Sequence, residues 1–241
     1  MMTHNQNTTA TSSGNISSAQ AGVSESLVQP RSSFYDHIRA AADAVVEFAL
    51  ATYADGQGRV YGETAIAAVA ALTGEFALRS TGMALPDKGA LVVGGVQDGI
   101  LFADTANHTA WSMITRAAAM AGLKPEELPD LSDIISRTLS GFGKSQFPPL
   151  TVPPRHFPRE CALNAGPRLR GRIVAIGERY SLPPTDIVLV LGWAVGAMII
   201  MMRKSLPPAI SVRLAAEVMI GMSRVGPLDR PMDDLVRPHA A

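Results

Sequence analysis

The stretch from residue 187 to residue 202 reads IVLVLGWAVGAMIIMM and contains no charged, amide or hydroxyl side chain. A helix of this composition has no polar face, so water has to be kept from it on every side. Its cover is either the rest of the chain or lipid. That choice constrains the fold more than any other feature of the sequence.

The length of this stretch favours protein as the cover. A helix of 16 residues spans about 24 Å, whereas the hydrocarbon core of a bilayer is about 30 Å thick. We therefore expect the helix to be buried by its own chain, and we keep membrane association as an alternative. The segment GWAVG at 192–196 is a small-xxx-small pattern, which allows close helix packing in either environment.

The composition also indicates extensive burial. Charged residues make up 17% of the 241 residues, compared with about 25% in a typical soluble domain. Aromatic residues make up only 5%, and the chain has 11 methionines, so aliphatic side chains and pliable Met have to fill the core. We expect the buried surface to include an interface with a second copy or another protein partner.

The formal net charge is zero, but the charges are unevenly distributed. Residues 1–141 carry eight basic and fourteen acidic residues, and residues 142–241 carry thirteen and seven. A neutral chain lacks the basic footprint of a nonspecific nucleic-acid binder, so we expect no nucleic-acid partner. The asymmetry suits docking of the two halves or head-to-tail association, and a chance distribution over a solvated surface explains it equally well.

Features of the N-terminus and the single cysteine predict a cytoplasmic protein. Residues 1–31 are polar, lack the apolar core of a signal peptide, and predict a disordered tail. Cys161 is the only cysteine, which excludes an intrachain disulfide and a multi-cysteine metal site. We expect no metal and no cofactor.

Apolar periodicity predicts a helical subdomain over residues 32–141. Its first helix begins at Ser32 or Ser33 and ends before the DGQG segment at 55–58, and further helices cover 63–80, 105–121 and 132–139. Gly122 is placed for a left-handed helix cap. The runs LVV at 91–93 and ILF at 100–102, separated by glycines and Asp98, predict one small β-hairpin.

The rest of the chain predicts a Pro-rich connector over 142–167 and a three-helix hairpin over 168–225. The connector contains six prolines, at 148, 149, 153, 154, 158 and 167, which exclude a persistent helix. The apolar helix is the middle one of the three, between helices at 168–180 and 208–224, and a tail at 226–241 follows. The predicted fold class is therefore mainly α, a helical bundle with one small β-hairpin.

Two motifs resemble known signatures and fail in context. The segment TLSGFGKS at 138–145 is close to a phosphate-binding loop, but a helix precedes it and prolines follow it, where the loop needs a strand and then a helix. Residues 173–199 have the cadence of a helix-turn-helix, but residues 194–202 offer no polar side chain to a base edge.

One segment, RHFPREC at 155–161, combines the residue types that bind anions or perform nucleophilic chemistry. The candidate ligand-binding residues are Arg155, His156, Arg159, Glu160 and Cys161, and no catalytic residue is assigned. The arginines suit an anion, and a Cys–His pair suits nucleophilic chemistry. A solvated basic loop anchored by Phe157 is the competing interpretation.

These observations favour a noncatalytic helical interaction or scaffold protein that associates with itself. The first alternative is an enzyme or an anionic small-ligand binder that uses the 155–161 loop against the N-terminal helices, with Glu63 or Glu75 as a carboxylate partner. The second is a membrane-associated protein that uses the helix at 187–202. Whether the chain is an enzyme is left open.

Overall fold

The computed structural model describes residues 31–90, 95–103, 108–141 and 150–232. Contacts divide the chain into a unit of residues 1–35 and a unit of residues 36–241, and the description below concerns the second unit. The predicted tails at 1–31 and 226–241 fall mostly outside the described residues, as does part of the predicted connector.

The described chain is mainly helical, as predicted. Its elements are α1 Arg31–Thr52, α2 Gly62–Arg79, α3 Val96–Phe102, α4 Ala110–Met120, the 3₁₀ turn η1 Pro125–Glu127, α5 Leu131–Gly141, the 3₁₀ turns η2 Pro154–His156 and η3 Ala162–Asn164, α6 Ala165–Arg179, α7 Pro184–Met202 and α8 Pro208–Met222. Gly122 has a φ of 98°, which confirms the predicted left-handed cap after α4. The predicted helices begin and end within a few residues of the observed ones, except that α4 begins five residues later than predicted.

The predicted β-hairpin is wrong. Residues 91–93 lie outside the described residues, and residues 100–102 belong to helix α3. Gln97 and Leu101, one helical turn apart, are the buried residues of this helix, which packs on α2 and α4. An apolar run of three residues does not distinguish a period of 2 from a period of 3.6, so tertiary packing decided its structure. The isolated bridge between Ala54 and Val60 is the only strand-like pairing in the described residues.

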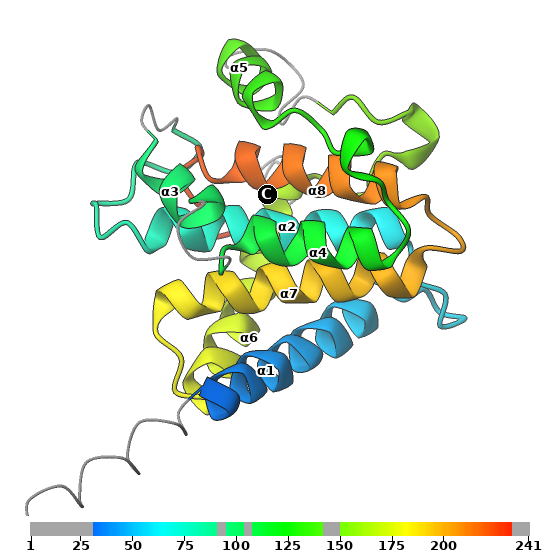
Figure 1. Ribbon diagram of the computed structural model, residues 1–241. Coiled ribbons are helices and arrows are strands. Elements are labelled where there is room, and N and C mark those ends of the chain that lie inside the picture. Colours follow the sequence, from blue (N-terminus) through cyan, green and yellow to red (C-terminus); the bar gives the residue numbers. More distant parts are fainter. Residues whose placement is uncertain (1–30, 91–94, 104–107, 142–149, 233–241) are drawn as a thin grey trace, which may run out of the picture. The chain divides into compact units, whose positions relative to one another are not determined.

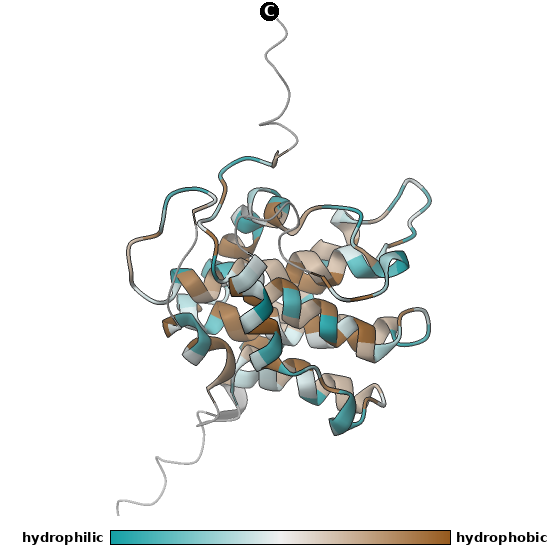
Figure 2. Ribbon diagram, turned by 90° about the horizontal axis from the view of Figure 1, so that it is seen from above, coloured by the Kyte–Doolittle hydropathy of each residue, from teal (hydrophilic) through white to brown (hydrophobic). Residues whose placement is uncertain are grey.

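Helix α2 lies at the centre of the core. Every residue from 64 to 78 is buried, and the helix packs against α7, α8 and α6. Figure 1 shows α2, α4, α7 and α8 lying side by side, and Figure 2 shows that the helices of the molecule carry many hydrophobic residues. Gly74 faces the α8 backbone at Met219 and Ser223, so the two helices touch at backbone distance.

The apolar helix α7 is covered mainly by α2 and α4, and it makes fewer contacts with its chain neighbours α6 and α8. A Cβ on Gly192 would lie 2.5 Å from the Ala110 Cα, and one on Gly196 would lie 2.7 Å from the Ala117 Cβ. The GWAVG pattern therefore brings α7 against α4 of the same chain.

Helix α7 also meets the length and hydropathy criteria for crossing a membrane, and it alone does so among the described residues. In the folded chain, 56% of the tested window is buried in protein. Ten of its residues are buried, from Ile187 to Ile199. By length and composition alone, such a helix fits a protein core as well as a bilayer.

The α4–α7 contact predicts opposite effects for alanine at two helical glycines. Gly192→Ala places a methyl group against the Ala110 backbone, so we expect a loss of about 1–3 kcal/mol in the free energy of unfolding. Gly171→Ala on α6 meets nothing within 4 Å, so its better helix propensity should stabilise the protein by up to about 1 kcal/mol. Urea unfolding of both variants measures the difference, and equal stability of the two would contradict the close packing.

Candidate functional site

The loop that carries the predicted site residues is fastened to helix α2 at two points. The His156 Nδ1 lies 2.9 Å from the Glu63 Oε1. Three residues before the start of η3, the Arg159 backbone N–H donates to the Thr64 hydroxyl at 3.0 Å. The side chains of His156 and Glu63 are only 13% and 15% exposed. The loop thus packs on the N-terminal turn of α2, and Glu63 is the carboxylate partner that the sequence suggested.

A pocket of about 580 Å³ opens where this loop meets the chain between α1 and α2. Its volume falls in the range of about 300–1,000 Å³ that is usual for small-molecule sites. The pocket is lined by Thr52, Tyr53, Ala54, Asp55, Arg59, Val60, Tyr61, Thr64, Arg159 and Glu160. We call it the Tyr61–Arg159 pocket. Two chain segments about one hundred residues apart form its wall.

Asp55 organises the turn that forms one side of the pocket. Its Oδ1 accepts hydrogen bonds from the backbone N–H groups of Arg59 and Gln57, at 2.9 and 2.8 Å. Its Oδ2 accepts from the Arg59 Nε at 2.9 Å. The backbone hydrogen bonds, first from Arg59 and then from Gln57, hold the pKa of Asp55 below its usual value. The carboxylate is therefore ionised, and its hydrogen bonds are made within the turn at residues 55–59.

Tyr53 and Glu160 form a second, more deeply buried part of the wall. Burial first, and then the negative charge of Glu160, raise the pKa of the Tyr53 phenol well above its ordinary value. Glu160 is in turn ion-paired with Arg168 of α6. The phenol is thus neutral at physiological pH, and the Glu160 charge is compensated from behind the pocket.

Arg159 is the cation in the wall that remains available. Its guanidinium carbon lies 3.2 Å from the centroid of the Tyr61 ring, so the planar group stacks on the aromatic face. No carboxylate of the described residues lies within 4.0 Å of this guanidinium. Stacking holds the group in one orientation and leaves its N–H edge for a ligand.

The structure divides the five predicted site residues. Arg159 and Glu160 line the pocket. His156 lies behind it, with its Nε2 accepting from the Arg155 Nε at 3.2 Å. Cys161 is exposed and is not part of the lining. The other suggested carboxylate, Glu75, lies elsewhere, in a buried cluster.

That cluster is structural. Glu75 is 2% exposed and accepts from Arg79 at 2.7 Å and from Arg170 at 2.5 Å. Arg170 also donates to the Leu228 carbonyl at 2.7 Å. These contacts join α2, α6 and the chain after α8, and they leave the carboxylate no exposure to a ligand. Within the described part of the chain, no group of three or more His, Cys, Asp or Glu side chains is arranged to hold a metal ion.

Sequence reasoning missed Tyr53, Asp55, Arg59 and Tyr61. Asp55 and Arg59 lie in a segment that the sequence indicates only as the end of a helix.

Comparison with known proteins finds no matching family model, no similar curated protein and no similar solved structure.

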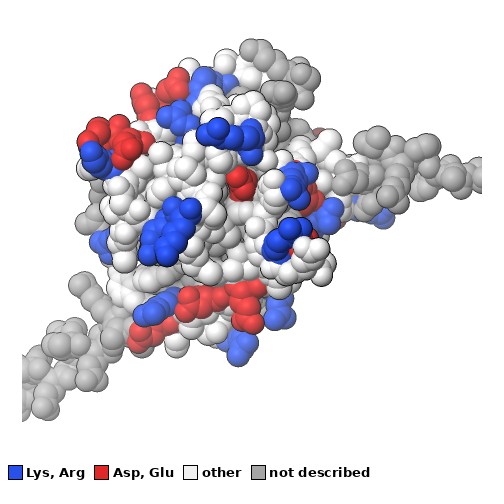
Figure 3. Space-filling model, turned by 90° about the vertical axis from the view of Figure 1, so that its right-hand side faces the viewer, with Lys and Arg blue, Asp and Glu red and all other residues white. Residues whose placement is uncertain are grey.

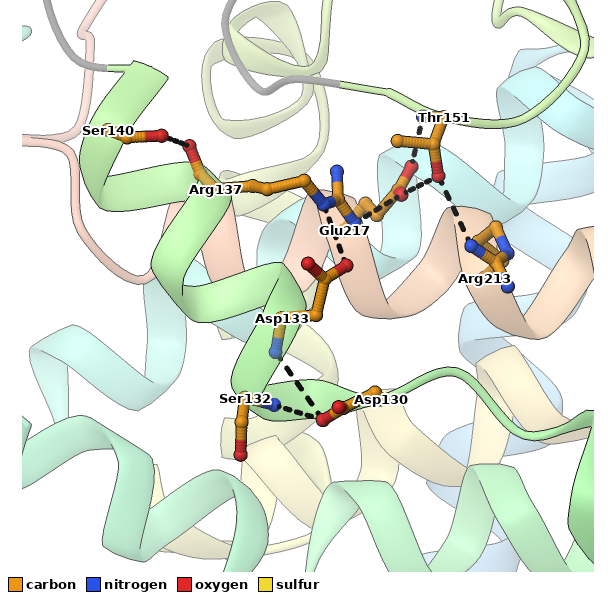
Figure 4. A network of polar contacts seen from close by, with 8 residues as sticks. All are labelled: Asp130, Ser132, Asp133, Arg137, Ser140, Thr151, Arg213 and Glu217. Carbon is orange, nitrogen blue, oxygen red and sulfur yellow. Dashed lines mark hydrogen bonds and ion pairs between the residues drawn. The ribbon is translucent and has the colours of Figure 1, made fainter.

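A second polar network surrounds the buried carboxylate of Glu217 on α8 (Figure 4). Its Oε1 accepts from the Arg137 Nη2 at 3.2 Å and from the Thr151 hydroxyl, and its Oε2 accepts from the Thr151 backbone N–H at 2.8 Å. Arg137 also reaches Asp133 at 2.8 Å. Two segments from outside α8 converge on this carboxylate, which fastens α5 and the Pro-rich connector at Thr151 to α8.

This network predicts that Arg137→Met destabilises the protein by about 3 kcal/mol, because it leaves the Glu217 carboxylate buried without its cation. Arg213→Met is the matched control. Arg213 reaches only the Thr151 hydroxyl, at 3.4 Å, and should cost less than about 1 kcal/mol. Urea unfolding measures both, and a loss of similar size in the two variants would remove Glu217 as the anchor.

Proposed function

We propose that this chain is a binding protein that takes a small organic anion in the Tyr61–Arg159 pocket. The observation that carries the proposal is the Arg159 guanidinium, which stacks on Tyr61 without a carboxylate partner among the described residues. The remaining charges of the wall are used within the protein, Asp55 by its own turn and Glu160 by Arg168. The Arg159 guanidinium also interacts with the Asp55 carboxylate across the pocket, where its charge helps to lower the pKa of Asp55. Because Asp55 is ion-paired with Arg59 and Glu160 with Arg168, the group of paired charges leaves one positive charge in excess, on Arg159.

The ligand class follows from the shape of that group and from its surroundings. A guanidinium binds a carboxylate or a phosphate through two parallel hydrogen bonds. The Val60, Ala54 and Tyr53 side chains add apolar wall to the pocket. A carboxylate or phosphate group on a small, partly apolar body fits this lining.

Binding is favoured over catalysis by the state of His156. Both of its ring nitrogens are engaged, Nδ1 with Glu63 and Nε2 with Arg155. A general base needs a free nitrogen within reach of a substrate. This histidine instead holds the loop in place.

Thermal unfolding of the full chain, in a panel of inorganic phosphate, phosphate monoesters and small carboxylates, tests the proposal. A ligand at ten times its Kd should raise the Tm by about 3–6 °C, which corresponds to about 1.4 kcal/mol of linkage. Arg159→Met keeps the length of the side chain and removes the charge, and it should abolish the shift.

Arg172→Met is the control, because this arginine also faces an aromatic ring, with its guanidinium carbon 5.9 Å from the Phe48 centroid, and lies outside the pocket. It should retain the full shift. A panel without any stabilising anion, or an equal shift in Arg159→Met, would refute the proposed function.

A further inference from the structure

Helix α7 keeps an uncovered stripe that no polar side chain interrupts. Leu189, Trp193, Ala197 and Ile200 are partly exposed, and Met201 is 59% exposed. Their spacing of three and four residues places them on one side of the helix. A solvent-facing stripe of a soluble helix normally carries polar residues, so this one indicates an apolar or lipid neighbour.

A shallow groove between α4 and α7 extends the stripe. The groove has a volume of about 170 Å³, and its lining includes Met120, Trp193, Ala197 and Ile200. Met120 is 73% exposed. The volume is below the range of about 300 Å³ and above that holds a whole small molecule. Parts of a larger apolar object therefore fit this surface, which we call the α4–α7 face.

The charges around this face are mainly basic. Gly192 meets Ala110 and Gly196 meets Ala117, so α4 and α7 run in the same direction and their C-terminal ends lie together. Arg116 lines the groove, and Arg203 and Lys204 follow directly after α7.

The carboxylates of these elements offset that charge only in part. Helix α4 has none, and Asp186, the single acid of α7, lies in its first turn, at the opposite end. The turn after α4 carries two acids, Glu126 and Glu127, and Glu127 accepts from the Lys124 backbone N–H at 2.8 Å. The cations at this end outnumber them and are Arg116, Lys124, Arg203 and Lys204. Figure 3 shows how sparse the charge is on the face that it draws, where wide areas carry neither a cation nor a carboxylate.

We propose that the α4–α7 face docks on an anionic lipid surface, with α7 lying in the plane of the bilayer. Apolar side chains beside cations are the combination that binds such surfaces, and a tryptophan is favoured at the interface between headgroups and acyl chains. Helix α7 does not cross the bilayer, because α2 and α4 cover its other sides.

A second copy of the chain fits this face less well than anionic lipid. A twofold pair centred on the groove would bring two Arg116 side chains together, and neither α4 nor the C-terminal end of α7 supplies an acid between them. Phosphate headgroups supply that negative charge. The proposal is independent of the ligand in the Tyr61–Arg159 pocket.

Flotation of the full chain with vesicles tests the proposal. The chain should float with vesicles of phosphatidylcholine and phosphatidylserine, float much less with phosphatidylcholine alone, and be released by high salt. Met120→Glu combined with Met201→Glu should reduce partitioning at least tenfold. Lys204→Gln alone should reduce it about fivefold.

The matched control is Val96→Glu combined with Met83→Glu. These residues are 59% and 44% exposed and lie outside the groove lining, so this variant should float like the original chain. Thermal unfolding confirms that all variants are folded. Equal flotation of the Met120/Met201 variant and the original chain, or no flotation on anionic vesicles, would overturn the proposal. So would a dimer in light scattering that only the Met120/Met201 variant dissociates, because it would assign the face to a second copy.

Discussion

The need to exclude water from one helix without polar side chains governs the whole structure. Sixteen consecutive residues of α7 contain no charged, amide or hydroxyl side chain, so other helices have to approach the helix closely. Glycines make this approach possible, since Gly192 and Gly196 lie against the backbone and small side chains of α4. Helix α2 closes another side and is itself buried from residue 64 to residue 78. Helix α7 is thus buried on the sides that face α2 and α4, and it keeps an exposed stripe on the remaining side.

Apolar buried helices offer few polar groups to which the connecting segments can form hydrogen bonds or ion pairs. The structure solves this with individual carboxylates that emerge from the core and are met by basic or hydroxyl groups from distant segments. Glu75 anchors α6, and Glu217 anchors α5 and the chain around Thr151. The reverse arrangement joins α3 to the chain after α8, where the buried Arg224 pairs with the more exposed Asp98 at 2.7 Å. The same device positions the candidate site, because the pairing of Glu63 with His156 places the loop that carries Arg159 against α2.

The uneven charge of the two halves has no single structural explanation. Some pairs join an acid of the first half to a base of the second, as Asp98 does with Arg224. Others run in the opposite sense, as Arg137 does with Glu217 and Lys88 does with Asp229. The described ion pairs thus do not sort by half, and the halves are held together by apolar packing between α2, α4, α7 and α8.

The sequence predicted the helices well because a long run of apolar residues at helical spacing forms a helix in almost any tertiary environment. It failed at residues 100–102, where three apolar residues were too few to define a period and contacts with α2 and α4 favoured a helix. The sequence also predicted that the chain itself buries α7, but it could not indicate that α2 and α4, distant in the sequence, provide most of the contacts. Of the candidate site, residue types indicated the 155–161 loop and Glu63, but Tyr53 and Arg59 carry no local signal, since only folding brings them to Arg159.

Hydrogen exchange of the α7 backbone amides in detergent-free buffer tests the central claim most directly. If α2 and α4 bury this helix in water, the amides of residues 188–199 should exchange as slowly as those in the middle of α2, near the rate set by global unfolding. Rapid exchange of α7 in buffer, with protection that develops only when detergent or lipid is added, would contradict the account.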